Sequence, residues 1–157
     1  MTLATLKNSL RDEPRLIWIR DQIYKIVVSQ RPQLVAIEGY SYKSESRKYD
    51  IGGLHNVVTV MLHEEGIPVL KGVPPKSLKR FVTGNGGADK AKMMDFVFTK
   101  WGIVPSDDDQ ADAAGLAMLA YVYLTRDSTL RHELEVARGL RWPAKKIRTK
   151  FYSEAAL

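Results

Sequence analysis

The chain is 157 residues long, has 24 Lys and Arg against 18 Asp and Glu, and carries a formal net charge of +6. It contains no cysteine, which excludes disulfides, thiolate metal sites and cysteine nucleophiles and fits a reducing, cytoplasmic setting. No stretch approaches the ~20 apolar residues that cross a bilayer, so we expect a soluble protein. The positive charge favours a polyanionic partner, although many basic proteins have other roles.

The first half of the chain alternates helical and strand patterns. Pro14 to Ser29 has apolar residues at three- and four-residue steps and predicts an amphipathic helix, which Pro32 ends. The apolar run Leu34 to Ile37 predicts a short buried strand that is followed at once by Glu38. Ile51 to Glu65 predicts a second helix. This helix carries more apolar surface than one sheet face needs, so it is a candidate dimer interface as well as a core helix.

The second half continues the alternation. Ile67 to Leu70 predicts a second strand, and a short helix is expected from Pro74 to Phe81. Asp89 is typical of the residue that caps a helix, and a helix through Trp101 follows it. The last strong helical pattern runs from Asp109 to Tyr123. The order of these elements predicts an α/β fold whose strands are parallel neighbours joined by right-handed crossovers.

The composition changes after Asp127. We therefore assign residues 1–126 to a single core domain and residues 127–157 to a basic C-terminal extension. Val136 to Tyr152 holds six cations and no acid, with three aromatic residues between them. Such a segment can neutralise phosphates while its aromatic rings stack on bases. The alternative is a solvated tail whose rings dock on the core, and of the two we favour contact with nucleic acid. The cations that we assign to DNA contact here are Arg138, Arg141, Lys145, Lys146 and Arg148.

Glu38 is a candidate site residue because of its place at the end of a strand. A carboxylate there lies at the carboxyl edge of the predicted sheet, where open α/β folds place their ligands. The alternative is an acid at a strand end that is merely solvated or paired with a lysine. From position alone this alternative is favoured.

A cluster of aspartates opens the last predicted helix. Asp109 and Asp112 stand three residues apart, share one helical face and can bind one hard cation together. Aspartates at a helix N-terminus also satisfy free amides without any further function, and we expect Asp107 and Asp108 to do only that. The small residues Ala113 to Gly115 favour the metal interpretation, because they would let this helix approach the sheet closely.

The glycine-rich stretch Gly84 to Gly87 does not match a nucleotide-binding loop. It lacks the Walker spacing and does not follow a strand, as a dinucleotide loop must. Lys79, Arg80 and Lys90 flank it. A flexible loop with these cations suits a groove for a DNA backbone.

Three segments, taken in order, resemble the RuvC Holliday junction resolvases, especially their bacteriophage branch: Leu34 to Tyr42, Pro74 to Lys90 and Asp109 to Ala113. The resemblance covers roughly Leu16 to Tyr123. It implies a ribonuclease-H-like fold with a mixed sheet flanked by helices, and a homodimer. It also implies nicking of symmetric strands in branched DNA (four-way junctions, flaps and forks) with Mg²⁺, or alternatively Mn²⁺, as the cofactor.

The resemblance also implies roles for individual residues. Glu38 resembles the strand-end metal ligand of the family, and Asp109 and Asp112 resemble its paired C-terminal acids. Lys79 and Lys90 look like two lysines of the family that assist catalysis and hold the DNA backbone. Either Tyr40 or Tyr42 falls near the aromatic residue that stacks on a base. The residues assigned to DNA contact in this part of the chain are Tyr40, Tyr42, Lys43, Arg47 and Arg80.

The chain departs from the family at its beginning. Family members start with a β-hairpin whose first strand carries an aspartate, whereas Met1 to Asp12 contains only Asp12, just before the first helix. We therefore expect the N-terminal strands to be missing or truncated. Three explanations are open: a truncated resolvase, which we favour, a catalytically dead DNA-binding relative, or a partner chain that supplies the strand.

The resulting hypothesis is an endonuclease that resolves Holliday junctions by metal-dependent phosphodiester hydrolysis in the cytoplasm, or in the host cytoplasm if a phage encodes it. Two other functions remain open. One is a catalytically impaired protein of the same fold that binds branched DNA. The other is a ribonuclease-H-type activity on RNA–DNA hybrids, which would use the same acids.

Overall fold

The computed structural model describes residues 12–39 and 45–140 and confirms the predicted α/β alternation. Helix α3 begins at Glu45 rather than Ile51. The second strand ends at Val73 rather than Leu70, because Lys71 and Gly72 interrupt its apolar pattern without ending its pairing. The elements are α2 (Asp12–Gln30), β1 (Val35–Glu38), α3 (Glu45–Glu64), β2 (Val69–Val73), α4 (Pro75–Thr83), α5 (Lys90–Trp101), α6 (Asp108–Thr125) and α7 (Arg131–Gly139).

The two strands that the structure describes pair in parallel, as predicted, and their register changes at the end that carries Glu38. Ile37 pairs with Lys71, whereas Glu38 pairs with Val73, so Gly72 is an extra residue in β2. Gly72 has a φ of 78°, a conformation that side chains other than glycine rarely adopt. Bulges of this kind redirect the strand and the side chains next to it. The bulge at Gly72 lies directly opposite the step from Ile37 to Glu38 and therefore affects the direction of the Glu38 side chain.

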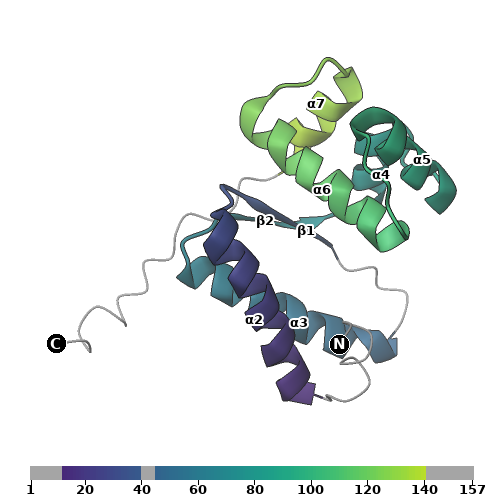
Figure 1. Cartoon of the computed structure of the whole chain (residues 1–157). Helices are drawn as coiled ribbons and strands as arrows, with labels where there is room; N and C mark the ends of the chain where they lie inside the picture. The colour runs from purple at the N-terminus through teal and green to yellow at the C-terminus, as the bar shows by residue number, and fades with distance from the viewer. Residues whose placement is uncertain (1–11, 40–44, 141–157) are drawn as a thin grey trace.

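Helices cover both faces of the sheet. Figure 1 shows α2 and α3 on one side and α4, α5, α6 and α7 on the other. The larger hydrophobic core lies on the second side and includes Phe81, Leu119 and Val97, all fully buried. A smaller core around Leu62 joins α2 and α3 to the sheet. Among the described helices, none combines the length and apolar character of a membrane span.

Helix α3 contributes three buried side chains to the smaller core, namely Val58, Met61 and Leu62. Val60 on the same helix is 56% exposed. The helix therefore has a core face, as the sequence indicated. Its role as a dimer interface stays a prediction.

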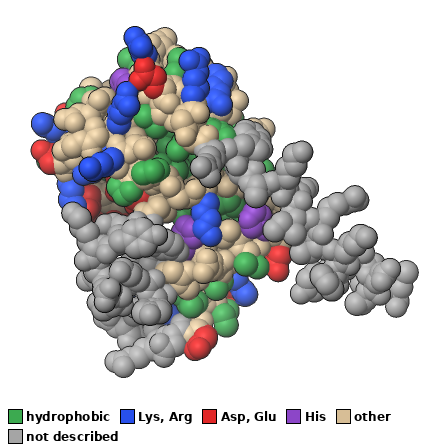
Figure 2. Space-filling view, turned by 180° about the vertical axis from the view of Figure 1, so that it is seen from behind, with side chains coloured by type: hydrophobic (Ala, Val, Ile, Leu, Met, Phe, Trp, Pro, Cys, Tyr) green, Lys and Arg blue, Asp and Glu red, His purple; other side chains and the backbone are tan. Residues whose placement is uncertain are grey.

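Helix α7 packs against α4 and α6 and adds Val136 and Ala137 to the larger core, although it lies in the segment assigned to the basic extension. The ammonium of Lys100 lies 2.6 Å from Oε1 of Glu133 and donates to the carbonyl of Val82 at 2.8 Å. Both side chains of this ion pair are largely buried. The packed core thus continues past residue 126. In the view from behind, Lys and Arg side chains gather on this half of the molecule (Figure 2).

One of the small residues of α6, Gly115, serves a contact with α4 that the sequence did not predict. A Cβ on Gly115 would lie 2.8 Å from Cγ2 of Val82 and 3.1 Å from Cδ1 of Leu78. Gly115 therefore admits helix α4, and Ala113 is exposed. Helix α6 also contacts β1, and Ala114 packs against the same core as Ala36 of that strand, so the predicted approach of α6 to the sheet is observed. Close packing of α4 on α6 sets the spacing between Lys79 and the aspartates.

We predict that Gly115→Ala lowers the free energy of unfolding, measured by urea denaturation. Overpacking costs roughly 1–3 kcal/mol, because the β-branched Val82 has little rotamer freedom in a helix. The better helix propensity of alanine returns at most about 1 kcal/mol.

The matched control is Gly139→Ala, because a Cβ on Gly139 meets no heavy atom within 4 Å. This change should leave stability equal or slightly higher. Equal effects of the two substitutions would show that the contact between α4 and α6 is not tight.

Candidate active site

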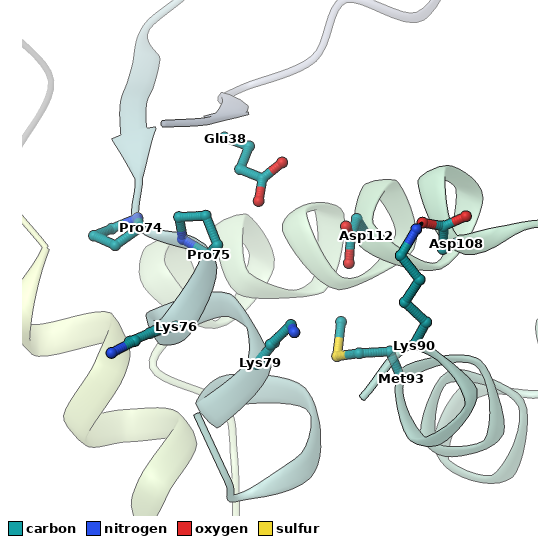
Figure 3. Close-up of a pocket in the computed structure, with 9 residues that line it drawn as sticks. All are labelled: Glu38, Pro74, Pro75, Lys76, Lys79, Lys90, Met93, Asp108 and Asp112. Atoms are coloured by element: carbon teal, nitrogen blue, oxygen red, sulfur yellow. Dashed lines mark hydrogen bonds and ion pairs between the residues drawn. The ribbon is translucent and has the colours of Figure 1, made fainter. Parts of the chain in front are cut away.

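A pocket of about 600 Å³ opens between the carboxyl end of the sheet and helices α4, α5 and α6. It brings together four of the five residues predicted to be catalytic: Glu38, Lys79, Lys90 and Asp112 (Figure 3). The fifth, Asp109, is exposed and does not line the pocket. The complete lining consists of Glu38, Pro74, Pro75, Lys76, Lys79, Lys90, Met93, Asp108 and Asp112.

Helix α4 delivers two lysines to this pocket. Pro74 has an extended backbone (φ −64°, ψ 137°) and Pro75 occupies the first helical position, where its missing N–H costs nothing. The helix ends at Gly84, whose φ of 77° is the left-handed conformation of a C-terminal cap. Both Lys76 and Lys79 line the pocket, but only Lys79 points its ammonium into it, whereas the side chain of Lys76 extends away (Figure 3).

The N-termini of α5 and α6 meet at the opposite wall. Asp89 caps α5 by accepting a hydrogen bond from the amide of Lys92 at 2.8 Å. Asp107 caps α6 by accepting from the amide of Gln110 at 2.8 Å, and Gln110 Oε1 accepts in return from the amide of Ser106 at 3.0 Å. This reciprocal arrangement fixes the first turn of α6. The predicted capping roles of Asp89 and Asp107 are confirmed.

The acids in and beside the pocket repel one another. Burial raises the pKa of the Glu38 carboxyl above its ordinary value of 4.5, and the charges of Asp112 and Asp109 raise it further, against the opposing effect of Lys79. Burial likewise raises the pKa of Asp112, with Asp108 as the next largest cause. The strand-end acid and the paired helix acids predicted from the sequence therefore lie within electrostatic range of each other. Their mutual repulsion is a property that a bound cation would relieve.

Lys90 is paired with Asp108, a residue expected only to cap the helix. The ammonium of Lys90 donates to Oδ2 of Asp108. This hydrogen bond raises the pKa of Lys90 and lowers the pKa of Asp108. The expectation for Asp108 was incomplete, because long-range pairing to α5 decides its role. A signal was present in the sequence, since Asp108 and Asp112 stand four apart and share a helical face.

Residues 3–120 match the family model described as "Crossover junction endodeoxyribonuclease RuvC". The chain belongs to this family. Among curated relatives of that name, the Gloeobacter violaceus protein is 29% identical over 71% of this chain and 65% of its own length. The Chloroflexus aurantiacus protein is 32% identical over 66% and 65%. The chain thus spans slightly less than two thirds of the length of these two relatives, and 77% of a Prochlorococcus marinus relative.

Solved RuvC structures share the fold. Thermus thermophilus RuvC in complex with Holliday junction substrate matches with a TM-score of 0.67 and 25% identity, covering 75% of this chain and 73% of that one. A second Thermus thermophilus RuvC structure matches with a TM-score of 0.65. These matches confirm the predicted ribonuclease-H-like α/β class.

The RuvC family consists of metal-dependent nucleases, and the donor chemistry of the pocket suits a metal. Glu38, Asp109 and Asp112 offer carboxylate oxygens, which hard divalent cations prefer. Within the described parts of the chain, no group of three or more His, Asp or Glu side chains is close enough to form a metal site by itself. The described acids therefore have the donor type and the charge that a cation requires. Their side chains do not by themselves form a complete ligand set.

The glycine-rich stretch is a closed turn that packs on α4. Asn85 Oδ1 accepts a hydrogen bond from the amide of Gly87 at 2.9 Å, and Thr83 Oγ1 accepts from the amide of Asn85 at 3.1 Å. A Cβ on Gly86 would lie 3.0 Å from the carbonyl oxygen of Lys76, so only glycine fits there without a shift. This turn is compact and is held by its own hydrogen bonds.

The other residues assigned to DNA contact lie away from the pocket or outside the described ranges. Arg80 points to α7 and donates to Oε2 of Glu135 at 2.6 Å. Arg138 is exposed on α7. Arg47 lies in α3, at a position whose side chain the structure does not describe. The assigned residues outside the described ranges are Tyr40, Tyr42, Lys43, Arg141, Lys145, Lys146 and Arg148.

We predict that Glu38→Gln raises the melting temperature at neutral pH in the absence of divalent cations. A carboxyl whose pKa is raised on folding stabilises the fold while it is protonated, and this contribution is lost as the pH rises through its pKa. Glutamine keeps the uncharged form at every pH. The gain should therefore disappear as the pH falls through the pKa of Glu38.

Glu13→Gln, an exposed change in the first turn of α2, is the control and should give no gain. Thermal unfolding followed by circular dichroism across pH measures both. A destabilised Glu38→Gln protein at neutral pH would contradict the repulsion described above.

Proposed function

We propose that this chain is a structure-specific endonuclease that resolves Holliday junctions and other branched DNA by metal-dependent phosphodiester hydrolysis. The observation that carries the proposal is the pocket in which Glu38 and Asp112 face Lys79 and Lys90. The family match supports it, because the relatives are named for this activity. A role in DNA recombination and repair follows from that activity.

Within this proposal the acids and the lysines have separate roles. Glu38, Asp109 and Asp112 would hold Mg²⁺, or alternatively Mn²⁺, and the bound ion would supply an activated water and stabilise the leaving oxygen. Lys79 and Lys90 offset the negative charge that develops on the phosphate during attack. Pro75 fixes the start of α4, so Lys79 on the following turn reaches the pocket from a rigid helix.

The substrate must span more than the pocket. We propose that the arms of the junction run over the half of the molecule formed by α4 to α7, where Lys and Arg side chains gather (Figure 2). Two symmetric nicks require two active sites, so we propose a homodimer with α3 as its interface. The protein would act in the cytoplasm, or in the host cytoplasm if a phage encodes it. The residues proposed to contact DNA are Tyr40, Tyr42, Lys43, Arg47, Arg80, Arg138, Arg141, Lys145, Lys146 and Arg148.

One observation favours a second candidate function, a branched-DNA binding protein with impaired catalysis. The described acids do not by themselves form a closed metal site. A protein with this pocket could hold DNA through its cations and yet fail to hydrolyse it. Cleavage and binding must therefore be measured on the same junction.

The test is cleavage of a synthetic four-way junction in Mg²⁺, with binding measured in parallel. We expect paired nicks from the unaltered chain and a loss of at least about a hundredfold for Glu38→Gln, since even supporting residues of metal sites cost 10–100-fold. Asp95→Asn makes the same chemical change outside the pocket and should cleave normally.

Junction binding without cleavage by the unaltered chain would establish the second candidate function. Cleavage of RNA–DNA hybrids with indifference to junctions would indicate a ribonuclease-H-type activity.

Lys79→Ala should lower turnover by about a hundredfold, the usual cost of removing one group that stabilises developing charge. Junction affinity should change by less than about threefold, because one cation among many contributes little to total phosphate neutralisation. Single-turnover cleavage and equilibrium binding separate the two effects.

Lys92→Ala removes an exposed lysine of α5 outside the pocket and serves as the control. Equal losses of turnover and affinity in Lys79→Ala would make Lys79 a simple backbone contact.

A further inference from the structure

The contact between Lys90 and Asp108 joins two helices at the mouth of the pocket. Lys90 is the first residue of α5, and Asp108 is the first residue of α6. Their side chains form a hydrogen-bonded ion pair. In Figure 3, the side chain of Lys90 extends from α5 and ends at Asp108, on the helix that also carries Asp112. The pair therefore bridges the pocket wall from which the aspartates project.

Lys90 depends on this contact for its position. Its side chain is 76% exposed, so packing restrains it little. A lysine has four rotatable carbons and a strongly hydrated head, and an unrestrained one samples many rotamers. Asp108 supplies a hydrogen bond, whereas Asp109 and Asp112 act on Lys90 only through their charges. Among these acids, Asp108 is the one that fixes the direction of the ammonium.

The partner of Lys90 sits on the same rigid turn as the other acids. Asp108 precedes Asp109 directly and lies one helical turn before Asp112. The reciprocal bonds between Asp107, Gln110 and Ser106 hold this turn in place. The location of the ammonium is thereby tied to the helix that carries the acids. A phosphate that enters the pocket beside these acids therefore also approaches the ammonium of Lys90.

We propose that Asp108 is a positioning residue that holds the ammonium of Lys90 over the pocket where the scissile phosphate enters. This inference rests on the proposed function of the pocket. Asp108 acts through Lys90 and does not itself touch the DNA. Removing Asp108 also removes a negative charge near a polyanion, which by itself strengthens binding. The proposal therefore gives an unusual combination: turnover falls while junction affinity stays equal or rises.

The first arm of the test measures the ion pair without DNA. Reductive methylation of lysines, followed by mass spectrometry, reports how freely each amine reacts. In Asp108→Ala, Lys90 should react faster than in the unaltered chain, while Lys92 on the same helix should react at an unchanged rate. The control is Asp95→Ala, an exposed acid of α5 outside the pocket, which should change neither rate. An unchanged rate at Lys90 in Asp108→Ala overturns the proposal.

The second arm is a double-mutant cycle on junction cleavage. Asp108→Ala should lower kcat by about two- to fivefold, the effect of an exposed ion pair, without weakening junction binding. Asp108→Glu, which keeps the charge, should recover most of this loss. In a Lys90→Ala background, Asp108→Ala should cause no further loss, because the residue through which it acts is absent. Asp95→Ala should leave kcat unchanged.

The outcomes of the cycle separate this proposal from the function on which it rests. Cleavage by the unaltered chain with an additive cycle, or with a higher kcat in Asp108→Ala, overturns the role of Asp108 and leaves the proposed function intact. No cleavage by the unaltered chain overturns the proposed function and this role with it. A non-additive cycle together with faster methylation of Lys90 supports the proposal.

Discussion

The partial burial of two acids, Glu38 and Asp112, in one pocket with further aspartates beside them is the constraint around which the rest of the structure is arranged. One acid stands at the end of β1 and the other on α6, and packing of α6 against the sheet holds them together. Both carboxyls have raised pKa values because they are partly buried and lie among other acids. A fold keeps such a cluster only where the surrounding packing exceeds the repulsion, and clusters of this kind mark functional sites.

The packing that opposes this repulsion comes from the side of the sheet that carries the pocket. Gly115 lets α4 and α6 approach each other, and the core between them includes fully buried Phe81 and Leu119. Helix α7 is fastened to the same unit through the ion pair of Lys100 with Glu133. Because α4 carries Lys79 and α6 carries Asp112, this packing also determines how far the cations lie from the acids. Stability and the geometry of the site therefore depend on the same contacts.

Much of this arrangement could be predicted from local sequence signals. Apolar periodicity located the elements, and a strand ending in Glu38 together with the spacing of Asp109 and Asp112 indicated the acidic site. What the sequence could not reveal depends on contacts between distant segments. The bulge at Gly72 arises from pairing between strands, and the partner of Lys90 lies on another helix. The spacing of Asp108 and Asp112 places them on one helical face but does not identify a partner on another helix, so capping was the natural interpretation of Asp108.

The function proposed for the pocket depends on whether its acids form a site for a divalent cation. Thermal unfolding during a Mg²⁺ titration, at constant ionic strength set with KCl, tests it most directly, since a ligand that binds only the folded state stabilises it. The account predicts a saturable rise in melting temperature for the unaltered chain. It also predicts little or no rise for a protein with both Glu38→Gln and Asp112→Asn. The presence of such a site would be contradicted if Mg²⁺ stabilised both proteins equally. It would also be contradicted if Mg²⁺ did not stabilise the unaltered chain.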